Sequence, residues 1–226
     1  MKILVDSSNY DYNQDDRLLI PFYESGKWGL CNKEGSVVLS AQYDEIRGCC
    51  KKESDLMLIV NKYTAAFLNG KKISQYKREH VGVVNSYGEI IIPPEYYSLE
   101  FVPGKRLAVA RNDDLQYGVI KMDGTPFIPF AKYQFISGFD HGHARVIITK
   151  QLPDNTFLDL WGIINTDGVE VLPVKYKEVW NFVGKNRNST RYVDFDGVCR
   201  EFVFPVSDDT CNNESSTPHY RLVAKI

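Results

Sequence analysis

One stretch of eight residues carries the strongest signal about how this chain folds: Trp161-Gly162-Ile163-Ile164-Asn165-Thr166-Asp167-Gly168. The bulky and β-branched residues at its start favour a short strand. Asn and Asp are typical turn residues, and a glycine at the end of such a turn supplies the positive φ that a type I turn with a glycine bulge needs. The stretch therefore predicts a β-hairpin whose turn closes at Gly168.

The same pattern recurs three times earlier in the chain. In every copy a bulky residue precedes a glycine, and a second glycine follows six residues later. A tyrosine comes further on, after a proline in three copies and after Ser40 in the first. The four copies span residues 28–46, 81–99, 117–136 and 161–179. At the usual glycine frequency of about 7%, four such second glycines would coincide with a probability on the order of 2 × 10⁻⁵. The chain therefore contains an internal repeat.

The residues that recur at fixed positions predict both turn geometry and a core. We expect positive φ at the four turn glycines, Gly35, Gly88, Gly124 and Gly168. A lone two-stranded hairpin is marginal in water, so each hairpin must bury its large apolar side chains against the next. We therefore expect burial of the residues that form the aromatic columns, Trp28, Trp161, Tyr43, Tyr96, Tyr133 and Tyr176. The prolines remove backbone donors, which predicts that they end the second strand of each hairpin or confine it to a sheet edge.

Short apolar stretches precede or separate the copies and predict linking strands at residues 18–22, 56–60, 107–110 and 144–148. No helical periodicity is sustained over three turns. We expect the longest loop within residues 61–78. The sequence thus predicts an all-β fold, a tandem array of about four β-hairpin repeats that forms a solenoid-like or partly closed antiparallel domain. Residues 1–226 would form a single domain, with residues 185–226 as an irregular or degenerate C-terminal repeat.

The combination of Trp161-Gly162, the six-residue glycine spacing, Pro173 and Tyr176 resembles the WG-repeat family of bacterial proteins. The resemblance covers roughly residues 18–183, and it departs from the pattern where Val81 and Tyr117 replace the tryptophan. It implies a tandem β-repeat array that is used for recognition. It implies no catalytic residue that could be assigned to a position of this chain.

Charge and cysteine usage limit the classes of partner. A net charge of −2 gives no electrostatic reason to expect nucleic acid or an anionic membrane as partner. Residues 1–16 lack a basic segment followed by an apolar one, and no later run is long enough to span a membrane. Five cysteines, two of them adjacent, do not indicate a disulfide framework. We therefore expect a cytoplasmic protein with reduced thiols.

Several residues could carry chemistry, and each has a simpler interpretation. His141 and His143 have a metal-like spacing, since residues two apart on a strand face the same side, but no acidic or cysteine cluster accompanies them. A catalytic thiol would need a neighbouring base, which the sequence cannot place; the cysteines are Cys31, Cys49, Cys50, Cys199 and Cys211. The paired carboxylates lie in polar stretches typical of solvated turns; these are Asp113, Asp114, Asp208 and Asp209. We therefore assign no catalytic, cofactor-binding or metal-binding residue.

The function predicted first is a non-catalytic scaffold that binds another protein, as an adaptor, a regulator or a toxin-neutralising partner. Recognition would then map to the non-repeating segments at residues 49–78, 141–143 and 185–218, because the repeated residues are accounted for by turns and packing. A second hypothesis is a glycan- or small-ligand-binding domain that uses a surface row of Trp28, Tyr117 and Trp161. A third is an enzyme whose site is built from the insertions at residues 49–78 and 185–226.

Overall fold

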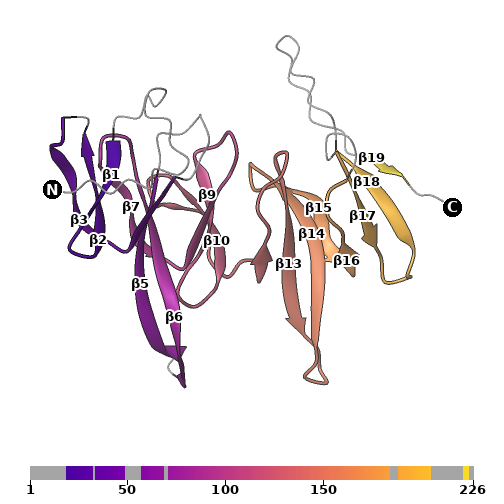
Figure 1. Cartoon of the computed structure of the whole chain (residues 1–226). Coiled ribbons are helices and arrows are strands. Elements are labelled where there is room, and N and C mark those ends of the chain that lie inside the picture. Colours follow the sequence, from indigo (N-terminus) through magenta and orange to yellow (C-terminus); the bar gives the residue numbers. More distant parts are fainter. Residues whose placement is uncertain are drawn as a thin grey trace, which may run out of the picture. The chain divides into compact units, whose positions relative to one another are not determined.

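The computed structural model describes residues 19–32, 34–48, 57–68, 71–183, 188–204 and 221–223. The regular elements of this part are all β-strands, arranged in five antiparallel sheets that follow one another along the chain (Figure 1). The predicted all-β fold is thereby confirmed. The described residues include no helix that could cross a membrane.

The strands run as follows. The first sheet contains β1 (Leu19–Glu24), β2 (Lys27–Asn32) and β3 (Val37–Tyr43). The second contains β4 (Glu45–Gly48), β5 (Met57–Leu68), β6 (Lys71–Val84) and β7 (Ile90–Tyr96). The third contains β8 (Ser98–Phe101), β9 (Leu107–Arg111), β10 (Tyr117–Lys121) and β11 (Pro126–Ile128). The fourth contains β12 (Phe135–Ile136), β13 (His143–Gln151), β14 (Phe157–Asn165) and β15 (Glu170–Tyr176). The fifth contains β16 (Glu178–Val179), β17 (Ser189–Val193), β18 (Cys199–Val203) and β19 (Arg221–Val223).

The boundaries of the sequence copies do not coincide with the boundaries of the sheets. In the fourth sheet, β12 is the last part of the third copy, β13 is a linking strand, and β14 with β15 is the hairpin of the fourth copy. The chain passes from one sheet to the next just after the repeated tyrosine, here between Tyr176 and β16. The second, third and fourth sheets therefore each contain residues of two successive copies, and in each of them the hairpin of one copy is extended by the linking strand that precedes it.

Residues after 185 contribute to a fifth sheet with the same strand order as the second and fourth. Val193 pairs with Cys199 on one side and with Glu178 on the other, as Ile147 pairs with Trp161 and Phe135 in the fourth sheet. Cys199 and Arg200 thus occupy the positions that Trp161 and Gly162 hold one sheet earlier. The repeat continues structurally here after its sequence signature has been lost.

The expected long loop at residues 61–78 is wrong. β5 and β6 pair with each other from Met57 and Val84 to Leu68 and Lys71, and they form the longest hairpin among the described residues. The sequence between the strands is Asn69-Gly70, which strongly favours a two-residue hairpin connection. Charged residues in this segment obscured the alternation of polar and apolar residues that is typical of a strand. The linking strands that the sequence predicts are confirmed as β1, β5, β9 and β13.

The predicted turn geometry is confirmed at all four glycines, whose φ angles are 83° at Gly35, 82° at Gly88, 80° at Gly124 and 76° at Gly168. At Gly168 the amide donates to the Asn165 carbonyl over 3.0 Å, and the Asn165 side-chain oxygen accepts from the amides of Asp167 and Val169. The Asn therefore fixes the turn from inside, and the glycine avoids the strain of a left-handed backbone.

The first glycine of each copy is needed for a different reason. A Cβ at Gly162 would lie 2.7 Å from the Leu172 carbonyl oxygen and 2.8 Å from Cα of Val174. The register between β14 and β15 shifts at this point, because Trp161 pairs with Tyr176 but Ile163 pairs with Leu172. The bulged segment that contains Pro173 thus crosses directly over Gly162. β7, β11 and β15, which carry or adjoin the repeated prolines, are edge strands, as predicted.

The chain divides into two compact units, which are described separately below: residues 1–99 with 110–115 and 120–125, and residues 100–109 and 116–119 with 126–226. In the first unit a core forms between the first two sheets around Leu30, Tyr43 and Ile59. In the second unit one core lies around Tyr133 and Ile164, and another joins the fourth and fifth sheets around Tyr176 and Phe202. The single domain that the sequence predicts stays a prediction.

The predicted burial of the aromatic columns is partly wrong. Tyr43, Tyr133 and Tyr176 are buried, whereas Tyr96 and both tryptophans are only half-buried. Trp161 stands directly opposite Tyr176 across its hairpin, and Trp28 stands directly opposite Tyr43. In these two copies a buried tyrosine therefore pairs with a half-buried tryptophan.

Candidate partner-binding surface

The two histidines with metal-like spacing do not share a face. His141 adopts φ 46° in a tight turn, and its Nδ1 lies 2.6 Å from a carboxylate oxygen of Asp140. His143 stacks on Phe204 with ring centroids 4.0 Å apart, and its Nδ1 lies 2.9 Å from the His141 carbonyl oxygen. Burial lowers the pKa of His143. Within the described ranges no group of three or more His, Cys, Asp or Glu residues is arranged to hold a metal ion.

The described cysteines have no activating neighbour. Cys31 is buried, its thiol donates to the Ile20 carbonyl over 3.5 Å, and burial raises its pKa, so the thiol stays protonated at neutral pH. Cys199 is exposed. Cys49, Cys50 and Cys211 lie outside the described residues, as do Asp208 and Asp209.

Asp113 and Asp114 lie in the turn between β9 and β10, as expected, but Asp113 also contacts the β5–β6 hairpin within the first unit. Its carboxylate accepts a hydrogen bond of 3.1 Å from the Tyr63 hydroxyl and lies 2.9 Å from Nε2 of His80. Its backbone carbonyl accepts a hydrogen bond of 2.9 Å from the guanidinium of Arg78. The sequence analysis missed this cluster because Asp113 is 33 to 50 residues away from the other members and no repeat column contains them.

A row of half-buried aromatic rings lies in the second unit. Phe135 makes edge-on contacts with Tyr117 and Trp161, at centroid distances of 5.4 and 6.2 Å. Two members of the row that the ligand-binding hypothesis required, Tyr117 and Trp161, are therefore connected through a third residue that it did not include. Trp28 belongs to the first unit, where it packs on Tyr23.

Residues on one side of the β13–β14 hairpin extend this row outward. The hairpin is regular over nine pairs, from His143 with Asn165 to Gln151 with Phe157, and it projects beyond the other strands of its sheet (Figure 1). Side chains two apart on a strand share a side, so Phe157 and Asp159 lie on the side of Trp161, and Arg145 lies there on the partner strand. We call Phe135, Arg145, Phe157, Asp159 and Trp161 the hairpin face.

Among the described residues of the second unit, Phe157 has the most exposed large apolar side chain, at 70%. Asp159 accepts a hydrogen bond of 2.6 Å from the Thr149 hydroxyl. The guanidinium of Arg145 lies 5.6 Å from the centre of the Trp161 ring and donates to the Val179 carbonyl over 3.2 Å. Burial lowers the pKa of Arg145. The hairpin face thus combines an exposed aromatic ring at one end with a half-buried cation at the other.

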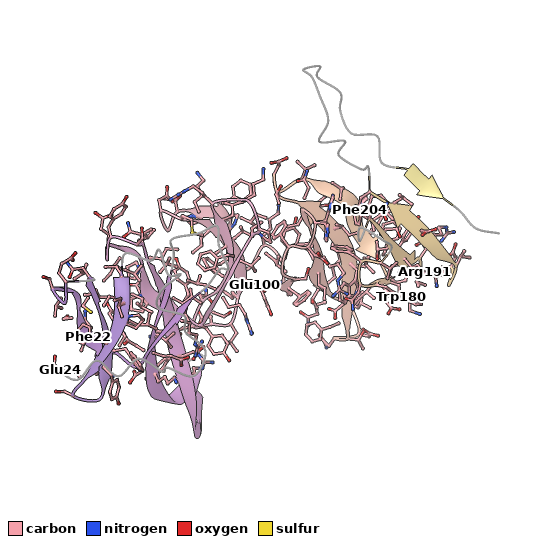
Figure 2. The ribbon with its side chains drawn as sticks, turned by 45° about the horizontal axis from the view of Figure 1, so that its top comes forward. Phe22, Glu24, Glu100, Trp180, Arg191 and Phe204 are labelled. Carbon is pink, nitrogen blue, oxygen red and sulfur yellow. The ribbon has the colours of Figure 1, made fainter. Side chains whose placement is uncertain are left out.

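The fifth sheet carries another exposed aromatic residue, Trp180, which is 42% exposed. Its amide donates to the Arg191 carbonyl over 2.8 Å, and the two residues lie together in Figure 2. Of the segments predicted to carry recognition, residues 49–56, 69–70, 185–187 and 205–218 lie outside the described part of the chain. The hairpin face lies outside the three predicted segments. Of its members the sequence analysis named only Trp161, and Phe157 could have been found as an aromatic residue just after the turn-like stretch 153–156.

The repeated glycine-closed turns and the successive antiparallel sheets define a tandem β-repeat protein. The family described as WG containing repeat matches residues 28–48, 82–115, 117–149 and 161–186, which together make up half of the chain. The chain belongs to this family. No curated protein and no solved structure matches it.

Proposed function

We propose that this protein is a non-catalytic repeat scaffold that binds another protein through the hairpin face. The observation that carries the proposal is the exposure of Phe157 on a regular, projecting hairpin. An aromatic side chain with this exposure costs free energy in water, and such residues commonly act as anchors in protein interfaces. The aromatic row lies on the same side about 13 Å farther along the hairpin, beyond Asp159, and adds apolar area to the face.

The edges of the sheets support binding by side chains rather than by strand addition. Pro173 lies within the edge strand β15, and Pro126 begins the edge strand β11. A proline has no amide donor for an added strand. Strand addition is therefore disfavoured at these two edges, which supports docking through side chains on the face of the hairpin.

The glycan-binding hypothesis has less support. Stacking of a sugar requires an open ring face. Phe135 contacts Tyr117 and Trp161 edge-on, and the Arg145 guanidinium lies over the Trp161 ring. The more accessible ring is Phe157, a single aromatic residue on a hairpin end, which suits a protein anchor better than a sugar platform.

The test is a quantitative pull-down from the organism that encodes the chain, with Phe157→Ser compared with the wild type. Tyr87→Ser is the matched control, because Tyr87 is an equally exposed aromatic residue, at 71%, next to a turn glycine in the first unit. We expect Phe157→Ser to lose the captured protein and Tyr87→Ser to keep it, with both melting temperatures unchanged. A partner retained equally by both variants would contradict the proposal.

A further inference from the structure

We propose that Arg145 binds a carboxylate of the partner, and that this carboxylate stands about four residues from the apolar side chain that contacts Phe157, in an extended segment. The inference rests on the proposed docking at the hairpin face and specifies the chemistry of what docks there. It follows from the state of Arg145 and from the spacing of the hairpin.

Arg145 has no anionic partner among the described residues. Its contacts in the described part of the chain are the Trp161 ring and the Val179 carbonyl, and no carboxylate there lies within ion-pairing distance of it. Arg47 and Arg200, by contrast, each pair with two carboxylates. A guanidinium carries five donors in a planar fork that matches a carboxylate. Arg145 therefore retains donors for a ligand, and its partial burial strengthens an ion pair formed there.

The spacing follows from the strand. Trp161, beneath the guanidinium, and Phe157 are four residues apart on one side of β14, which corresponds to about 13 Å at a rise of roughly 3.3 Å per residue. An extended peptide covers this distance in about four residues. A partner strand segment with an acidic residue at one position and an aromatic or aliphatic residue four positions away would satisfy both ends at once.

Asp159 lies between the two ends and restricts the middle of the segment. Its carboxylate faces the same side, so a second carboxylate opposite it would be repelled. The residue two positions along the partner segment should therefore be neutral or basic. The free C-terminal carboxylate of a partner could supply the anion in place of an Asp or Glu side chain, because the guanidinium recognises the same group in both.

The test uses a phage-displayed library of random 12-residue peptides selected on the full chain, with parallel selections on Arg145→Gln, Phe157→Ser and Arg191→Gln. Arg191 is an exposed arginine on the neighbouring sheet and serves as the control. We expect wild-type and Arg191→Gln selections to be enriched in acidic residues three to five positions from an apolar one. Arg145→Gln should lose only the acidic preference, and Phe157→Ser only the apolar one.

The best peptide is then synthesised with a free or an amidated C-terminus and with its acidic residue changed to the amide. On the wild-type protein, loss of the carboxylate should weaken binding about tenfold or more, and this measurement does not depend on whether Arg145→Gln folds. Weakening by amidation alone would identify a C-terminal carboxylate. Binding that depends on Phe157 but on no carboxylate would overturn this inference and leave the proposed function intact. Selection of no peptide that depends on Phe157 would overturn both.

Discussion

The second and fourth sheets have the same register but present different chemistry on the same side. Glu45, Val60, Val81 and Tyr96 pair across the second sheet as Phe135, Ile147, Trp161 and Tyr176 pair across the fourth. In the second sheet the charges are satisfied by one another. Arg47 bonds to Glu45 and Glu79 over 2.6 and 2.9 Å, and Lys62 bonds to Glu45 over 2.9 Å.

In the fourth sheet the charged and aromatic side chains on the same side do not all find partners among themselves. Phe135 stands where Glu45 does, Trp161 where Val81 does, and Asp159 where Glu79 does. Arg145 meets no carboxylate among the described residues, and Phe157 is exposed. The comparison shows that the repeat sets the backbone, whereas the residues that vary between copies decide whether a sheet satisfies itself or keeps contacts available for a partner.

The largest effect on stability is expected where the two sheets are most alike. Gly162→Ala and Gly82→Ala should each lower the free energy of unfolding by about 3 kcal/mol, because the new methyl group meets backbone atoms of the bulged strand, 2.5–2.8 Å away. Gly168→Ala, at a turn with no atom closer than 3.5 Å, should cost only about 1 kcal/mol. Urea unfolding measures all three. Equal losses at Gly162 and Gly168 would refute the close-approach explanation.

Exchange of the residues that differ should have an intermediate effect. Trp161→Val should cost about 1–2 kcal/mol, since the side chain is only half-buried. Val81→Trp should cost about 1–3 kcal/mol through overpacking, because Val81 is 2% exposed. Urea unfolding again provides the measurement. If Val81→Trp were neutral, the two positions would be interchangeable and the comparison would lose its basis.

The two units should respond to acid in different pH ranges. Burial lowers the pKa of His143, so the folded state disfavours the imidazolium. Its contribution is complete above the unfolded pKa of about 6.5 and is lost as the pH falls below it. Hydrogen bonds from Arg47 and then from Lys62 lower the pKa of Glu45 from 4.5 to about 2, so its contribution persists to pH 4.5 and is lost between there and about 2.

The measurement is the free energy of unfolding from pH 8 to pH 3 for the wild type, His143→Leu and Glu45→Gln. His143→Leu should flatten the curve between pH 7 and 5, and Glu45→Gln should flatten it below pH 4.5. A wild-type slope near pH 6 that persists in His143→Leu would assign the titration to another group.

The smallest effect is expected from the ion pairs of the second sheet. Arg47→Met should change the free energy of unfolding by about 1 kcal/mol at most, because the partners are roughly one-third exposed and solvent screens them. The loss should shrink further at 1 M salt. Partner capture should be unchanged, in contrast to Phe157→Ser. Loss of capture in Arg47→Met would move the binding surface to the second sheet.

Local rules were sufficient for the elements whose signal lies within a few residues. The Asn and Gly of each turn, the bulky residue before the first glycine and the apolar linking stretches predicted the turns, most strands and the family. The β5–β6 hairpin was not predicted because its many polar residues obscure the two-residue alternation of a strand. The turn signal Asn69-Gly70 was present in the sequence. The candidate site was missed for another reason: Phe135, Arg145 and Trp161 belong to different strands, and the sequence marked only Trp161 among them.

The sequence by itself determined the all-β class, the glycine-closed turns, the proline-bearing edge strands and membership in the WG containing repeat family, because each depends on backbone geometry that a short peptide already specifies. Only the tertiary structure decided which tyrosines are buried, why Gly162 cannot carry a side chain, and that Arg145 lies over Trp161 without a carboxylate beside it in the described residues. These features depend on the register between strands and on the packing of one sheet against the next. Register and packing join residues that are distant in sequence, so no local pattern can encode them.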